Sequence, residues 1–203
     1  MQIDITLKAM KSKYGHLIYA FDMVNEEDVN DGIHKFKDLI DEAKKTDPNL
    51  ECCFHAGESV SSENSNMYDA FIIGSKRIGH GFNLALHPHL VEKVKEQDIC
   101  LEVCPISNFV LGYTLDLRCH PARFLLNQGV QMSINSDDPG FWDYDNLTLD
   151  FAYVFIAWEL TLSDLKKLVW NGVKYSSVTE EEKESLYKKL EGDWNTFVSS
   201  NQD

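Results

Sequence analysis

The stretch CCFHAGES, residues 52–59, decides the fold class. An apolar run leads into His55, and Glu58 follows three positions later, just after a glycine. A short apolar run that ends at a glycine is typical of a buried strand. The strand therefore ends in an imidazole and a carboxylate, side chains that are seldom buried without a partner. The stretch predicts a buried strand with chemically capable groups at its carboxyl end.

Five apolar runs of this kind alternate with amphipathic segments. The predicted strands are 17–24, 50–57, 76–82, 99–106 and 130–137, with helices between them at 26–45, 67–75, 88–97 and 120–129. Three further helices are expected at 146–160, 162–176 and 179–198, the last opened by a capping box of Thr179 and Glu182. Repeated strand–helix units predict an α/β fold with a parallel sheet, in a single domain spanning residues 1–203.

The strand ends discriminate between a doubly wound sheet and a (β/α)8 barrel. Four of the five runs finish in polar groups: His55 with Glu58, His80, Ser107 with Asn108, and Asp137 with Asp138. In a barrel the carboxyl ends of the strands converge around one axis, so these groups would meet at one site. No glycine-rich nucleotide fingerprint follows any strand, which removes the main reason to prefer a dinucleotide-binding sheet. We therefore predict a barrel of the TIM type.

Composition excludes several classes of partner. The 203 residues carry 19 basic and 33 acidic side chains, a formal charge of -14, which argues against nucleic acid and against an anionic membrane surface. No apolar run reaches the roughly 18 to 20 residues that span a bilayer. Five cysteines, an odd number, are expected as free thiols. The first residues, MQIDITLKAMKSKYG, lack a secretory signal, which predicts a cytoplasmic protein for the chain as given.

Histidines and carboxylates at successive strand ends suit a hydrolytic metal site. Zn²⁺ binds imidazole nitrogen and carboxylate oxygen and keeps one position open for water. A carboxylate that is not a ligand, such as Glu58, can then serve as a proton donor. Each piece alone also has a structural explanation, because a histidine after a strand is often a buried structural residue and an Asp-Asp-Pro turn is often only a turn. The joint pattern favours a metal-dependent hydrolase.

Four motifs resemble a known family in order and spacing. FHAGES (54–59), RIGHGFNL (77–84), EVCPISN (102–108) and INSDDP (134–139) are similar to the adenosine deaminase family of zinc-dependent (β/α)8 hydrolases. AFDMVNEED (20–28), DLRCHPARFLLNQGV (116–130) and VKYSSV (173–178) look closer still to its secreted growth factor-related branch, the adenosine deaminase 2 type. The resemblance covers almost the whole chain. It implies hydrolysis of adenosine, and of 2'-deoxyadenosine, to inosine and ammonia.

The resemblance also implies roles for individual residues. His55 matches a zinc-binding histidine, and Asp137 matches the carboxylate that meets the zinc. Glu58 matches the acid that protonates the purine ring at N1. His80 matches the histidine that orients the attacking water.

Two further positions are expected to contact the purine. Asp138 matches the carboxyl group that forms a hydrogen bond with N7 of the purine. Asn25 stands where the family usually has a glycine whose backbone N–H meets the purine, and an asparagine keeps that N–H. His120, which precedes Pro121, is expected to be a structural residue at a helix start.

The chain departs from the family pattern at its beginning. The family carries a His-x-His pair on its first barrel strand, which supplies two further zinc ligands, and no such pair precedes residue 55. The five predicted strands therefore correspond to strands four to eight, a partial barrel. His87 and His89 have the right spacing but are expected at a helix start, away from the site.

Two classes of function follow from this departure. The first is a zinc-dependent deaminase with a small purine nucleoside as its partner, secreted as in the resembling branch. The second is an inactive relative that acts as a binding or interaction protein. In either class, the exposed edge of the first strand at residues 18–23 favours self-association, so a homodimer is an expected partner.

Overall fold

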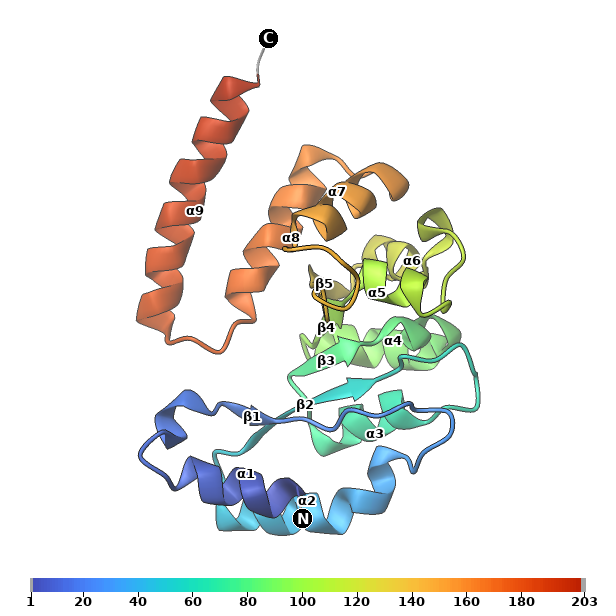
Figure 1. The fold of residues 1–203 in the computed structure, drawn as a ribbon, viewed down its shortest axis with the longest axis vertical. Coiled ribbons are helices and arrows are strands. Elements are labelled where there is room, and N and C mark those ends of the chain that lie inside the picture. The colour runs from blue at the N-terminus through green and yellow to red at the C-terminus, as the bar shows by residue number, and fades with distance from the viewer. Residues whose placement is uncertain (1, 202–203) are drawn as a thin grey trace.

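A computed structural model describes residues 2–201, so residues 1, 202 and 203 of the predicted domain lie outside the described residues. Five parallel strands form one sheet in the order β1-β2-β3-β4-β5 (Figure 1). The strands are Ala20–Phe21, Glu51–Ala56, Arg77–His80, Cys100–Val103 and Gln131–Ile134. Each strand pairs with the next one in sequence, whereas a doubly wound sheet reverses its order in the middle. The prediction of barrel-type winding is confirmed, and each predicted run contains one of the five strands.

One α-helix precedes the first strand, and the others connect the strands or follow the last one. They are α1 Gln2–Met10, α2 Lys37–Thr46, α3 Asn66–Ile73, α4 Pro88–Glu96, α5 Pro105–Val110, α6 Pro121–Asn127, α7 Thr148–Ala157, α8 Leu162–Lys174 and α9 Glu180–Ser200. Figure 1 shows α9 beside α8 and standing away from the sheet. The predicted capping box of Thr179 and Glu182 opens α9. Within residues 2–201, no helix combines the length and apolar character that crossing a membrane requires.

The predicted helix at 26–45 is wrong in its first part. The helix α2 begins only at Lys37, after a short 3-10 turn, and Gly32 has an extended backbone. Residues 26–32 form a loop instead, because the carboxylates of Glu27 and Asp28 bind the turn that follows β2. Two helices, α1 and α5, were not expected, and α5 begins inside the run predicted as the fourth strand.

The two faces of the sheet differ in chemistry. One residue in two along each strand packs into the apolar core beneath the helices, among them Phe54, Ile78, Leu101 and Met132. The alternate residues face the other way. On that second face, Arg77 of β3 forms an ion pair with Glu102 of β4 at 2.8 Å. His55 belongs to the second face, so the candidate site lies at its carboxyl end.

Candidate functional site

Three strand ends place potential metal ligands next to one another. His55, His80 and Asp137 each offer one ligand atom, and these atoms all lie within 4.8 Å of one another. The two imidazole rings lie 5.1 Å apart, and His80 Nε2 is 3.8 Å from Asp137 Oδ2. His80 and Asp137 both have a φ of 58°, an uncommon conformation for residues other than glycine that is found at functional sites. Convergence of these side chains was the expectation from the sequence.

A carboxylate on the neighbouring strand fixes the orientation of His55. Asp22, just after β1, accepts a hydrogen bond from the backbone N–H of His55 at 2.9 Å and lies 2.7 Å from its Nδ1. Since a carboxylate can only accept, Nδ1 carries the proton, and in the neutral ring Nε2 keeps a free lone pair. Burial opposes a charge on His55, but the Asp22 hydrogen bond and the surrounding carboxylates raise its pKa above the ordinary value. Gly79 permits this packing, because a Cβ there would lie 3.1 Å from the His55 ring.

The turn after His55 is held from the loop that follows β1. The carboxylate of Glu27 accepts hydrogen bonds from the backbone N–H groups of Gly57, at 3.0 Å, and Glu58, at 2.8 Å. Gly57 has a φ of 75°, and a Cβ there would lie 2.6 Å from the sulfur of Met67. Only glycine suits this position, so the turn aims Glu58 into the site.

Glu58 has the environment of a proton donor. Its side chain is 15% exposed, and burial together with the negative charge of Asp137 raises its pKa to about 7. A carboxyl group with this pKa is partly protonated at neutral pH, whereas an exposed one is not. Asp138 is exposed, and its charge contributes to the same shift. The Glu58 Oε1 lies 3.3 Å from His80 Nδ1.

His80 is the most deeply buried of these groups. Its side chain is 2% exposed, and burial together with the positive charge of His55 lowers its pKa to about 4. His80 Nδ1 lies 3.1 Å from the amide nitrogen of Asn108, a buried residue of α5. The amide oxygen of Asn108 lies 3.1 Å from Nε2 of His120, at the start of α6.

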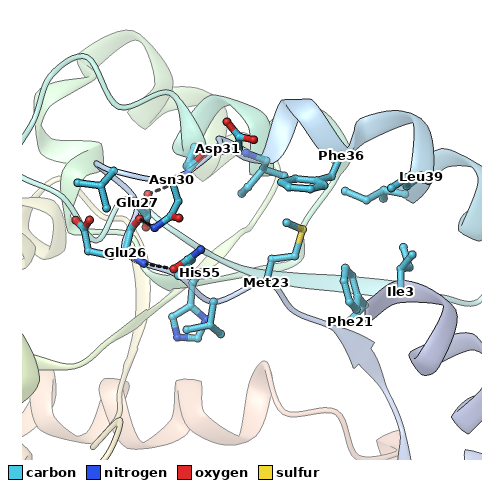
Figure 2. A pocket seen from close by; sticks show the side chains of 16 residues that line it. Ile3, Phe21, Met23, Glu26, Glu27, Asn30, Asp31, Phe36, Leu39 and His55 are labelled. Carbon is cyan, nitrogen blue, oxygen red and sulfur yellow. Dashed lines mark hydrogen bonds between the residues drawn. The ribbon is translucent and has the colours of Figure 1, made fainter. Parts of the chain in front are cut away.

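A cavity of about 660 Å³ opens beside His55. Figure 2 shows His55 at one end and apolar side chains at the other, among them Phe21, Met23 and Phe36. Asn25 lines the same cavity, and its side chain accepts a hydrogen bond from the backbone N–H of Glu26. The predicted purine-contacting position Asn25 therefore lies near the ligand cluster.

The structure gathers four of the six predicted site residues, His55, Glu58, His80 and Asp137, and places Asn25 and Asp138 at the margin of that cluster. His87 is not part of the cluster; it is buried against Asn83, with its Nε2 2.7 Å from the amide oxygen.

The residues that hold these side chains, namely Asp22, Glu27, Asn108 and His120, are not among those predicted from the sequence. Asp22 follows a strand, so the rule applied to the other strands could have found it. His120 does begin a helix as expected, but it also contacts the site through Asn108. Asn108 follows the fourth predicted strand, and its position in the sequence alone indicates no role.

Comparisons with known proteins identify the family of the chain. The family model described as Adenosine deaminase matches residues 3–192. Adenosine deaminase 2 of Dictyostelium discoideum is 37% identical over 194 residues, which is 93% of this chain and 36% of that protein. The 203 residues of this chain therefore span only about a third of the length of that relative.

Solved structures share the fold. The adenine deaminase of Arthrobacter aurescens superposes with a TM-score of 0.80 at 24% identity, over 97% of this chain and 59% of that one. An amidohydrolase from Burkholderia ambifaria, solved with bound Zn, gives a TM-score of 0.80 at 18% identity, over 98% and 56%. These neighbours show that the chain has their α/β fold. The match of the family model over residues 3–192 leads to one conclusion: the chain belongs to the adenosine deaminase family.

Proposed function

We propose that this protein is a zinc-dependent hydrolase that deaminates adenosine and 2'-deoxyadenosine to inosine and ammonia. The observation that carries the proposal is the cluster of His55, His80 and Asp137, with Glu58 at a pKa of about 7 directly beside it. A metal position next to a carboxylic acid is what hydrolysis at an aromatic amino group requires. By the same family relationship, we propose that the working protein is secreted.

The donor set fits zinc. Zn²⁺ binds neutral imidazole nitrogen and carboxylate oxygen, which His55 Nε2 and Asp137 offer. A carboxylate on the far nitrogen of a ligating histidine, here Asp22, is the usual outer partner at such sites. When bound, zinc would act as a Lewis acid that makes water nucleophilic near neutral pH.

The remaining side chains act on the substrate. Glu58 donates its proton to N1 of the purine, which makes the ring more electrophilic at C6, where water adds and ammonia leaves. A pKa near 7 suits this task, because the acid is then protonated in a large fraction of molecules and still gives up its proton readily. The carboxyl group of Asp138 forms a hydrogen bond with N7, and the backbone of Asn25 meets the purine from the cavity side.

The small number of direct zinc ligands limits the zinc affinity and the activity that we expect of the 203 residues alone. Catalytic zinc sites normally use at least three protein ligands, and we assign two, His55 and Asp137. We therefore expect the isolated chain to bind zinc weakly and to turn over adenosine far more slowly than the roughly 10 per second of a typical enzyme. An inactive family member that binds a partner is the alternative.

Zinc titration and inosine formation test the proposal together. The chain is titrated with Zn²⁺ while the ring signals of its histidines are followed by NMR, and inosine is assayed with adenosine, 2'-deoxyadenosine and, as a control, cytidine. We expect zinc to perturb His55 and any inosine formation to stop when zinc is chelated. Failure of zinc to bind near His55 would favour the binding-protein alternative, and chelator-resistant turnover would exclude a zinc enzyme.

A further inference from the structure

Asn108 lies at the centre of a chain of hydrogen bonds that begins at a backbone amide. The backbone N–H of Ala122 donates to His120 Nδ1 at 3.1 Å. His120 Nε2 lies 3.1 Å from Asn108 Oδ1, and Asn108 Nδ2 lies 3.1 Å from His80 Nδ1. Asn108 and His120 are at most 2% exposed, so water cannot substitute for these contacts.

The backbone amide fixes the position of every proton in this chain. A backbone N–H can only donate, so His120 Nδ1 must be the unprotonated nitrogen. The neutral ring, which burial favours, then carries its proton on Nε2. That Nε2–H must face an acceptor, so the oxygen of the Asn108 amide points toward His120 and the nitrogen points toward His80. The orientation of the amide thus follows from the backbone.

Only one tautomer of His80 gives its neighbour Asn108 a hydrogen-bond acceptor. Since Asn108 Nδ2 can only donate, His80 Nδ1 must accept and His80 must carry its proton on Nε2. The competing partner is Glu58, whose Oε1 lies 3.3 Å from the same Nδ1. A proton on Nδ1 would serve Glu58 but would face the Asn108 donor, which His120 prevents from turning. The second N–H of Asn108 instead points to Glu58 Oε1, at 3.5 Å.

We propose that Asn108, locked in orientation by His120, is a positioning residue that keeps the proton of His80 on Nε2. This nitrogen is the one on the Asp137 side of the ring. His80 therefore donates a hydrogen bond toward the space between itself and Asp137 and has no lone pair there to bind a metal. The significance for catalysis rests on the proposed function, because a donor at this point orients the attacking water and stabilises the oxygen that it becomes.

The chain of hydrogen bonds from Ala122 through His120 and Asn108 to His80, called the relay below, gives His80 a different tautomer from His55. His55 holds its proton on Nδ1, because its partner Asp22 is an acceptor, and His80 holds its proton on Nε2, because its partner Asn108 is a donor. Of the two rings, only His55 presents a lone pair to the metal position.

Long-range ¹⁵N–¹H correlation spectra of the chain, recorded without metal or substrate near pH 7, measure the tautomers. We expect the Nε2–H form of His80 to exceed the Nδ1–H form by about tenfold or more, since the second form loses a hydrogen bond and brings two donors together. His120 is expected as Nε2–H and His55 as Nδ1–H in the same spectrum. A predominantly Nδ1–H His80 would overturn the proposal and show that Glu58 controls this ring.

Asn108→Asp tests the cause. The new carboxylate would accept from both histidines, so His80 should switch to the Nδ1–H form while His120 stays Nε2–H. The matched control is Asn171→Asp, the same change at another buried asparagine, whose amide donates to the backbone of Met132. His80 should not change there. An unchanged His80 in folded Asn108→Asp, or a switch in the control as well, would overturn the role of Asn108.

The outcome is independent of the proposed function. If Asn108→Asp does not fold, the tautomers of the unsubstituted chain still decide whether the relay exists. Neither spectrum requires zinc or turnover, so a chain that never deaminates adenosine could still confirm the relay, and an active one could still contradict it.

Discussion

The two histidines of the site lie side by side and differ in almost every property that matters for chemistry. His55 ends β2, is held by the carboxylate of Asp22, and has a raised pKa. His80 ends β3, is held by the amide of Asn108, and has a pKa lowered to about 4. Their rings are 5.1 Å apart, so position alone does not separate them. The group that contacts Nδ1 of each ring, an acceptor for His55 and a donor for His80, therefore decides which nitrogen of the neutral ring carries the proton.

The largest expected effects separate the proposed proton donor, Glu58, from the proposed metal ligand, Asp137. Glu58→Gln should lower kcat by about 10²-fold or more, because the proton transfer is lost. The zinc content should stay intact, because the substitution removes no coordination bond. Asp137→Ala should lower zinc occupancy as well as rate. Metal analysis and steady-state kinetics, in whichever form of the protein turns over adenosine, would check both. Zinc loss in Glu58→Gln with full zinc in Asp137→Ala would mean that the two roles are reversed.

A smaller effect is expected from the carboxylate that holds His55. Asp22→Asn should weaken zinc binding about 10- to 100-fold, since outer partners of ligating histidines contribute this much. Asp28→Asn is the matched control, because Asp28 binds Ser59 and Asn64 in the same loop and does not contact His55. Zinc titration calorimetry on both variants measures the difference. Equal losses would assign the effect to the loop as a whole.

The opposite pKa shifts of Glu58 and the buried histidines predict a change in stability with pH. His80 and His120 have a pKa of about 4, below the ordinary 6.5, so the unfolded chain binds more protons between these values and stability falls on acidification. Glu58, raised from 4.5 to about 7, has the opposite sign: its contribution is present below pH 4.5 and is lost as pH rises through 7.

Glu58→Gln removes the opposing contribution. The variant should therefore lose more free energy of unfolding between pH 7 and pH 5 than the unsubstituted chain, by on the order of 2 kcal/mol. Urea unfolding at the two pH values measures this. An equal or smaller loss in the variant would contradict the raised pKa of Glu58.

The strands and the ligand cluster could be predicted because both depend on local patterns. Apolar runs bounded by glycine, proline or asparagine placed all five strands, and groups at the ends of parallel strands must converge. The loop at 26–32 could not be predicted in this way. Its acidic residues are typical of the first turn of a helix. In the structure, Glu27 and Asp28 instead bind the turn after β2, about thirty residues further along the chain.

The relay could not be predicted either, for a related reason. Asn108 and His120 are twelve positions apart and lie on different helices, and nothing in the spacing says that one side chain touches the other. A histidine before a proline is typical of a helix start, and His120 does cap α6. Nothing in this local pattern indicates that its ring also contacts Asn108. The α5 helix was hidden because a short apolar run is compatible with a strand or a buried helix.

Zinc titration of the chain, followed through the ring nitrogens of both histidines, tests the contrast between them most directly. We expect zinc to bind His55 Nε2, while His80 keeps its proton on Nε2 at saturation. Displacement of the His80 proton by zinc, with His55 Nε2 unaffected, would contradict it.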